Sequence, residues 1–154
     1  MTYDSREDTN KHINKVKDFA GHLTILFLTR AIDHDASKLR DPEKAVFDEV
    51  TPKLKHLTYG SDEYKQSLAD MGPALQHHYE NNRHHPEHHE NGIDDMNLVD
   101  IMEMFCDQYA ATKRHADGDM MKSIDINTKR FKMSEQLAQI FRNTIPLMEE
   151  ADAS

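Results

Sequence analysis

The segment MNLVDIMEMFCDQYAATKRHA, residues 96–116, decides the fold of this sequence. Its apolar side chains recur at intervals of three and four, as they do on one face of an α-helix. These residues are Leu98, Ile101, Met102, Phe105 and Tyr109. Gly118 follows where the helix is expected to end. The pattern therefore predicts a long amphipathic helix. Because Asp107 lies inside its apolar segment, we expect the carboxylate of this residue to be half-buried.

The same helical periodicity extends over the rest of the chain, and no segment shows the convincing two-residue alternation of a strand. The expected helices are residues 5–20 with an apolar continuation at 23–34, one that begins at Asp41-Pro42, one capped by Ser61 or Asp62, then 73–82, 96–116, 119–132 and 134–149. Gly21 is either a break or only a weak point, and Pro146 is expected to interrupt the last helix. We therefore predict an all-α fold, a compact single-domain bundle of about six to seven helices spanning residues 1–154.

Composition restricts the class of protein. The formal net charge of −9 argues against a partner such as duplex nucleic acid, which requires phosphate neutralisation. The longest apolar run, residues 23–28, is too short for a membrane span, so no membrane partner is expected. The charged N-terminal segment has no signal-peptide core, and the single cysteine, Cys106, excludes an internal disulfide. These features predict a cytoplasmic protein.

Two segments offer carboxylate and imidazole ligands for a metal ion. Asp107 needs a cation or several donors if it is buried, and a salt bridge to Arg114 is the alternative explanation. His34 and Asp35 close an apolar helix, and a polar helix C-terminus explains this pair equally well. An imidazole and a carboxylate together suit a borderline divalent ion. We predict that His34, Asp35 and Asp107 are metal ligands.

An early histidine is expected to add to this set. His12 lies in register with Val16, Phe19 and Leu23 on one helical face, whereas His22 is offset from that face. We therefore favour His12 over His22 as a ligand, although an inward histidine is often an ordinary core residue.

Six of the eleven histidines lie between positions 77 and 89. His78 is the member of the first pair expected to point inward, and His84 and His85 lie in an expected loop at residues 83–95, where site residues often gather. The alternative is a solvated histidine-rich loop that binds metal only adventitiously. We predict that His78 and His85 are metal ligands and that the loop packs near the helices that carry His34 and Asp107.

Basic residues near these segments are candidates for binding an anionic substrate. Lys38 lies four residues after His34, and Arg83 and Arg114 are further candidates, although each arginine is equally plausible as a surface residue. Cys106 has no adjacent base and is not expected to be a nucleophile. The sequence contains no glycine-rich phosphate loop and no serine-hydrolase or zincin motif.

These motifs resemble the HD-domain superfamily of metal-dependent phosphohydrolases, which is all-helical. His34-Asp35-Ala36-Ser37-Lys38 is similar to the HD-x-G-K segment of its phosphodiesterase branch, with Ser37 in place of the glycine. His77-His78-Tyr79-Glu80 resembles that branch's His-His-Glu segment, and residues 101–111 resemble the helix that supplies the last aspartate. The resemblance covers roughly residues 10–115 and leaves the C-terminal helices, 119–149, unmatched. The G-Y-P element of cyclic dinucleotide phosphodiesterases is replaced by residues 83–88, RHHPEH.

The chain also resembles a group of short, uncharacterised proteins often found in phage genomes. The shared segments are N-x-H-H-P-E-H and D-x-x-E-M, and this second resemblance covers nearly the whole chain. It implies host cytoplasm as the location if the chain is phage-encoded, and it carries no established activity.

The HD-domain resemblance implies a phosphohydrolase that acts on a nucleotide or a related small phosphate ester through a metal-activated water. One ion would be bound by His12, His34, Asp35 and Asp107, and His78 and His85 would bind a second ion or orient the substrate. The implied catalytic residues are Lys38, His84 and Glu87, and the implied substrate-binding residues are Lys38, Arg83 and Arg114. The cofactor would be one or two divalent transition-metal ions, drawn from Mn, Co, Fe, Ni and Zn.

Two alternative functions stay open at this level. Some HD-fold enzymes use a di-iron site for oxygen-dependent cleavage, and a set of histidine and aspartate ligands is compatible with that chemistry. A phage-type protein that binds a nucleotide or a host protein without catalysis is the other alternative. The sequence also leaves the oligomeric state open, with a homo-oligomer as one alternative.

Overall fold

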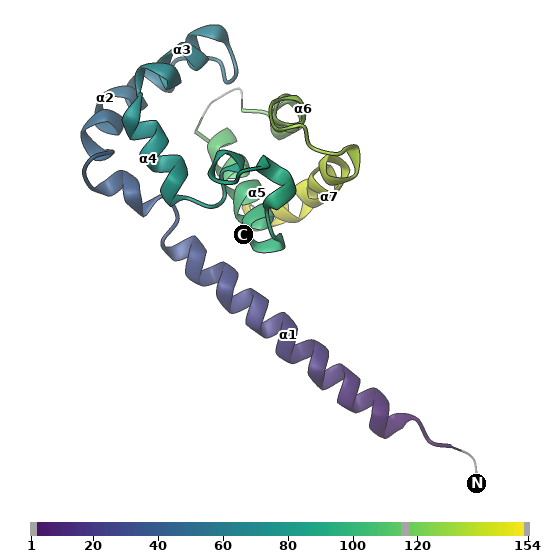
Figure 1. Cartoon of the computed structure of the whole chain (residues 1–154). Helices are drawn as coiled ribbons and strands as arrows, with labels where there is room; N and C mark the ends of the chain where they lie inside the picture. Colours follow the sequence, from purple (N-terminus) through teal and green to yellow (C-terminus); the bar gives the residue numbers. More distant parts are fainter. Residues whose placement is uncertain (1–2, 115–117, 153–154) are drawn as a thin grey trace. The chain divides into compact units, whose positions relative to one another are not determined.

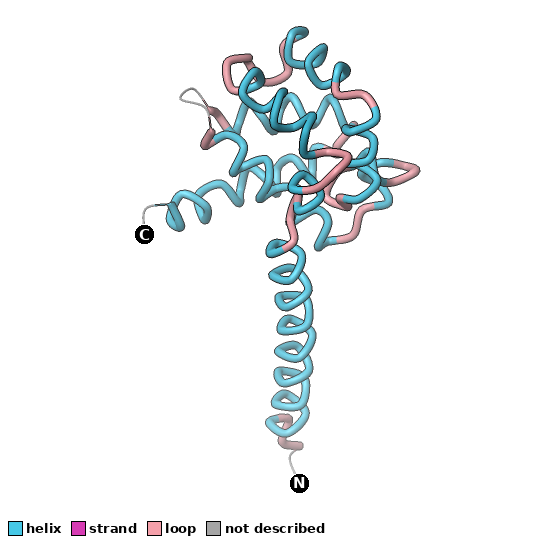
Figure 2. Tube along the Cα trace, turned by 90° about the vertical axis from the view of Figure 1, so that its left-hand side faces the viewer, coloured by secondary structure: helices cyan, strands magenta, loops and turns pink. Residues whose placement is uncertain are grey.

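The computed structural model describes residues 3–114 and 118–152 and confirms the all-α prediction. Seven α-helices and three short 3-10 turns account for its regular structure, and no strand occurs among the described residues (Figure 2). The chain divides into two compact units, residues 1–34 and residues 35–154, and each is considered by itself. The prediction of a single domain over residues 1–154 stays a prediction.

The first unit consists of one helix, α1 (Arg6–Ile32), of 27 residues (Figure 1). The helix continues through Gly21, so this glycine is a weak point and not a break. A single glycine in a helix interior costs only about 1 kcal/mol relative to alanine, which the surrounding backbone hydrogen bonds can offset.

The second unit begins with the 3-10 turn η1 (Ala36–Leu39), followed by α2 (Lys44–Leu54), α3 (Asp62–Asp70) and α4 (Pro73–Asn81). Ser61 caps α3 by accepting a hydrogen bond from the backbone N–H of Tyr64. Gly72 adopts a φ of 49°, a conformation that favours glycine, and Pro73 then starts α4. These short connections keep α2, α3 and α4 together (Figure 1).

The histidine-rich loop follows α4 and contains two 3-10 turns, η2 (Pro86–His88) and η3 (Gly92–Asp95). Next come α5 (Leu98–Thr112), α6 (Met120–Phe131) and α7 (Glu135–Asp152). These three helices enclose the main hydrophobic core, which contains Met104, Phe105, Tyr109, Met120, Ile124, Met133, Ala138 and Phe141. In the chain, the loop therefore connects the helices α2, α3 and α4 with the helices α5, α6 and α7. Both groups of helices can contact it.

Two helix boundaries differ from prediction. The second helix begins at Lys44 and not at Asp41-Pro42, because the N–H groups of Glu43 and Lys44 both donate to the carbonyl of Arg40, so that residues 41–43 form a turn. The last helix continues through Pro146 to Asp152. Residues 115–116, the expected end of the central helix, lie outside the described residues. Among the helices that the structure describes, none combines the length and the apolar content that a membrane crossing requires.

Candidate metal centre

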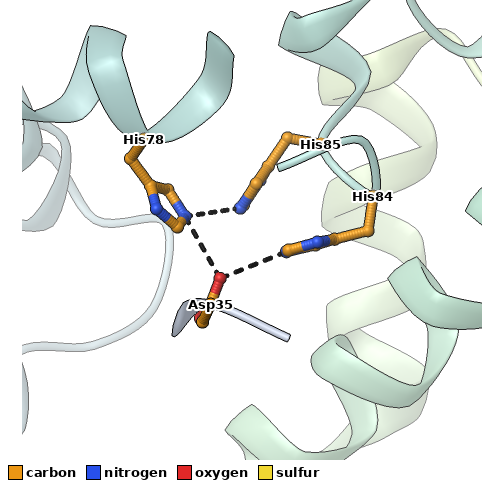
Figure 3. Close-up of side chains that lie close together, drawn as sticks. All are labelled: Asp35, His78, His84 and His85. Carbon is orange, nitrogen blue, oxygen red and sulfur yellow. Dashed lines mark hydrogen bonds and ion pairs between the residues drawn. The ribbon is translucent and has the colours of Figure 1, made fainter. Parts of the chain in front are cut away.

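Four side chains of the second unit converge on one point: Asp35, His78, His84 and His85. Each offers one ligand atom, and these atoms all lie within 4.8 Å of one another. Figure 3 shows the three imidazole rings and the carboxylate pointing toward one another from the residue before η1, from α4 and from the histidine-rich loop. A segment before α2 thus meets two segments that are more than forty residues away in the chain.

The separations between these atoms suit a shared metal ion. Nε2 of His78 lies 2.9 Å from Nε2 of His85 and 3.4 Å from Oδ1 of Asp35. Nε2 of His84 lies 3.6 Å from the same Asp35 oxygen. Atoms that coordinate one transition-metal ion at about 2.0–2.2 Å are themselves roughly 3–4 Å apart. These three separations match the donor spacing of a single ion, and the remaining pairs of ligand atoms lie within 4.8 Å.

Asp35 reaches this point through an unusual backbone conformation. Its φ of 57° and ψ of 15° place it in the left-handed region, just before η1. Aspartate tolerates this region better than most residues, and non-glycine residues held there are more frequent at functional sites. Nζ of Lys38 contacts the other carboxylate oxygen of Asp35 at 2.6 Å and lies 4.9 Å from the ring centre of Phe47.

Glu43 orients His78 and was not identified from the sequence. Its fully buried carboxylate contacts Nδ1 of His78 at 3.0 Å and Nδ1 of His77 at 2.7 Å. Asn82 Nδ2 also approaches Nδ1 of His78, but its two hydrogens are directed to Ser37 Oγ and to the His78 carbonyl. Because a carboxylate only accepts hydrogen bonds, His78 carries its proton on Nδ1. Its Nε2 lone pair therefore points to the cluster.

A second buried carboxylate lies next to Nδ1 of His84, as that of Glu43 lies next to Nδ1 of His78. Oε1 of Glu103, on α5, lies 3.1 Å from Nδ1 of His84, whose ring is almost completely buried. A carboxylate next to Nδ1 favours the tautomer in which Nε2 is available to a metal. Glu103 and Asp100 are both buried, so neither of these carboxylates on α5 faces solvent.

The electrostatic environment favours the neutral form of two of these histidines, His78 and His85. Burial, together with repulsion from His84 and His78, lowers the pKa of His85 to about 2. Burial and the nearby Lys38 also lower the pKa of His78, against the opposite effects of Asp35 and Glu43. Neutral imidazole is the form that binds metal ions. His78 and His85 are therefore favoured at neutral pH in the form that can bind a metal ion.

Of the predicted metal ligands, the structure brings together Asp35, His78 and His85. His84, predicted as a catalytic residue, lies in the same cluster. Asp107 is half-buried on α5 and offers an oxygen within 4.8 Å of a ring nitrogen of His84. His12 and His34 belong to the first unit, and their roles as ligands stay predictions.

The remaining predicted site residues have other partners. Arg83 pairs with the buried Asp100 at 3.2 Å, and Glu87 pairs with Arg130 at 2.6 Å. Arg114 lies beside Thr51 and Lys55 at a separate hollow of about 470 Å³. Lys38 is the predicted substrate-binding residue that directly contacts a member of the cluster.

A second hollow, of about 320 Å³, lies next to the cluster. Its lining includes apolar groups of Leu68, Ala69 and Leu75, together with Tyr79 and Glu87. The ring centre of Tyr79 is 4.9 Å from that of His85, so this tyrosine contacts both the hollow and the cluster.

Comparison with known proteins identifies a family. Residues 1–147 match a family described as "Family of unknown function (DUF5662)". The chain belongs to this family. No curated protein and no solved structure matches the chain. Membership of DUF5662 supplies no activity, so a functional assignment depends on the cluster itself.

Proposed function

We propose that this chain is a metal-dependent phosphohydrolase that acts on a nucleotide or a related small phosphate ester. The observation that carries the proposal is the convergence of Asp35, His78, His84 and His85 on one point, with a buried carboxylate behind each of two imidazoles. Imidazole nitrogens and a carboxylate oxygen that face one point are the ligand types that hold a divalent transition-metal ion. The HD-domain resemblance supplies the reaction class.

The donor set favours a transition metal. Three imidazole nitrogens and one carboxylate suit Mn, Fe, Co, Ni or Zn, whereas Mg and Ca prefer oxygen ligands. Asp107, whose carboxylate approaches His84, extends the set on the α5 side and is our candidate for further coordination. A bound divalent ion supplies a nucleophilic water at neutral pH and polarises a phosphoryl oxygen.

Lys38 is our candidate for holding the phosphate. Its ammonium group has three N–H donors, of which Asp35 accepts one. The remaining donors can contact phosphate oxygens next to the metal ligands. The Phe47 ring supports the side chain in this position. The contacts of His84 with Asp35 and Glu103 favour a ligand role over proton transfer, and the pairing of Glu87 with Arg130 favours a structural role.

The hollow beside Tyr79 is our candidate for the organic part of the substrate. It combines apolar and aromatic lining, as most small-molecule sites do. Its lining carboxylates, Glu80 and Glu87, disfavour a phosphate there, which agrees with placing the phosphate at Lys38.

Phosphate release tests the proposal. Metal-free protein would be reconstituted separately with Mn, Co, Fe, Ni and Zn and assayed against nucleoside mono- and triphosphates and a generic phosphodiester. We expect metal-dependent release that falls by more than about 100-fold in Asp35→Asn, beyond the usual cost of losing an outer-shell partner. Asp48→Asn removes an exposed carboxylate paired with Lys44 and is the matched control.

The negative outcomes separate the alternatives. A protein that holds iron, releases no phosphate and consumes oxygen would favour the di-iron oxygenase. A protein that binds nucleotide equally well with and without Asp35→Asn, and hydrolyses none, would favour a binding protein.

A further inference from the structure

Arg130 on α6 contacts the histidine-rich loop from the C-terminal helices. Its NH2 nitrogen lies 2.6 Å from Oε1 of Glu87 and 3.4 Å from the hydroxyl of Tyr79. One nitrogen with two hydrogens therefore reaches both the loop and α4. The ion pair is only partly exposed, with about a third of each side chain accessible, so solvent screens it less than a surface pair.

Both partners of Arg130 are neighbours of His85. Glu87 lies in η2, which begins immediately after His85. The ring of Tyr79 packs against the His85 ring, with 4.9 Å between their centres. The Tyr79 carbonyl also lies 3.0 Å from Nδ1 of His88, which ties α4 to the same turn. Arg130 thus holds the ring that packs on His85 and the turn that follows it.

His85 depends on this packing more than the other two histidines do. Glu43 contacts Nδ1 of His78, and Glu103 contacts Nδ1 of His84. Within residues 3–114 and 118–152, His85 has no carboxylate partner of this kind, and its polar contact is with His78. Its ring packs against those of His84, His78 and Tyr79, with 4.1, 4.8 and 4.9 Å between the ring centres, and of these three rings Tyr79 is the one that Arg130 contacts.

We propose that Arg130 is a positioning residue for His85, and that it acts from α6 through Tyr79 and Glu87. The effect on metal binding rests on the proposed function, whereas the effect on the ring of His85 does not. The C-terminal helices are then part of the metal centre's support, although the HD-domain resemblance leaves them unmatched.

Cobalt binding tests this role in the full-length protein. Co²⁺ titrations would compare affinity and visible absorption bands in wild type, Arg130→Gln and Arg130→Lys. We expect Arg130→Gln to weaken Co²⁺ binding by about tenfold, the lower end of outer-shell effects, and to shift the bands. Arg130→Lys keeps the charge but not the planar group and should rescue binding in part.

Arg142→Gln is the matched control. Arg142 also pairs with two carboxylates on α6 and α7, Asp125 and Glu135, and neither of these lies in the loop. We expect wild-type affinity and bands from this variant. If Arg130→Gln lowers the melting temperature more than Arg142→Gln does, Arg130→Gln is replaced in the comparison by Glu87→Gln. This variant removes the other partner of the Arg130–Glu87 pair.

A metal-free measurement separates this inference from the proposed function. The ring carbon–proton resonance of His85, assigned by its loss in His85→Gln, would be compared by NMR in the same variants. If wild type binds no Co²⁺, the proposed function fails, and a resonance that moves in Arg130→Gln but not in Arg142→Gln still supports the positioning role. An unchanged His85 resonance, or unchanged affinity and bands where cobalt does bind, overturns the inference.

Discussion

Glu43 shows at the residue scale how one buried carboxylate organises its surroundings. Its two oxygens contact His77 and His78, and Ser37 Oγ lies 3.0 Å away. We predict that Glu43→Gln weakens metal binding by about 10- to 100-fold, because the amide can donate to Nδ1 of His78 and stabilise the wrong tautomer. Competition with a metal-sensitive dye measures the affinity.

Glu49→Gln is the control for this prediction. Glu49 lies on α2, the helix that Glu43 immediately precedes, but it is exposed and paired with Lys53. Equal affinities for the two variants would show that Glu43 does not act on the metal ligands.

The lowered pKa of His85 predicts the pH dependence of stability in metal-free protein. The folded state keeps this ring neutral down to a pH of about 2, whereas the unfolded chain protonates it below its ordinary pKa of 6.5. Protonation therefore favours unfolding, so the stability that the neutral ring preserves above pH 6.5 is lost as the pH falls. This histidine alone should lower the free energy of unfolding by about 1.5–2 kcal/mol between pH 6.5 and 5.

Urea unfolding at the two pH values, with chelator present, checks the prediction. His85→Gln should flatten the pH dependence, and His56→Gln, which changes an exposed histidine, should not. The same pH dependence in wild type and His85→Gln would contradict the account.

The sequence named three members of the cluster as ligands, but the HD-domain resemblance assigned Asp35 to one ion and His78 and His85 to a second ion or to the substrate. Asp35, His78 and His85 stand in segments with enough ligand-type residues to attract attention, and the structure brings them together. Glu43 gave no such signal, because it precedes an ordinary helix and its role depends on where α4 lies. Arg130 was missed for the same reason, since its partners are 43 and 51 residues away.

At the element scale, α5 depends on its N-terminal cap. The Asn97 side chain accepts hydrogen bonds from the N–H groups of Val99 and Asp100, and the Asp100 carboxylate accepts one from the N–H of Asn97. We predict that Asn97→Ala lowers the free energy of unfolding by about 1 kcal/mol, measured by urea denaturation.

Asn97→Asp keeps an acceptor at the cap and should retain most of this stability. A loss in Asn97→Asp as large as that in Asn97→Ala would mean that the capping box is not what stabilises α5.

The helices themselves were largely predictable, whereas some of their ends were not. Periodicity located the long apolar helices, because it reports which face is buried. Local signals left open whether Gly21, where α1 continues, is a break, and they were misleading at Pro146, which lies within α7. Backbone hydrogen bonds on either side of these residues outweigh their low helix propensity, and a propensity argument cannot weigh that balance.

At the scale of the whole second unit, α7 completes the core that supports α5 and α6. Phe141 is 3% exposed, and its ring packs edge-on against Phe105, with 5.0 Å between the ring centres. We predict that Phe141→Ala costs about 3–5 kcal/mol of unfolding free energy. Chemical denaturation monitored by circular dichroism measures the loss.

Ile140→Ala changes the neighbouring but exposed position on α7 and should cost far less. Similar losses for the two variants would show that α7 does not pack as described.

Metal content tests the central claim most directly. Tag-free protein, purified without chelator, would be compared by elemental analysis with Asp35→Asn and with His56→Gln as control. We predict at least one equivalent of a transition metal per chain in wild type and in His56→Gln, and its loss in Asp35→Asn. Absence of bound metal from wild type, even after incubation with Mn, Co and Fe, would contradict the assignment of Asp35, His78, His84 and His85 as a metal centre.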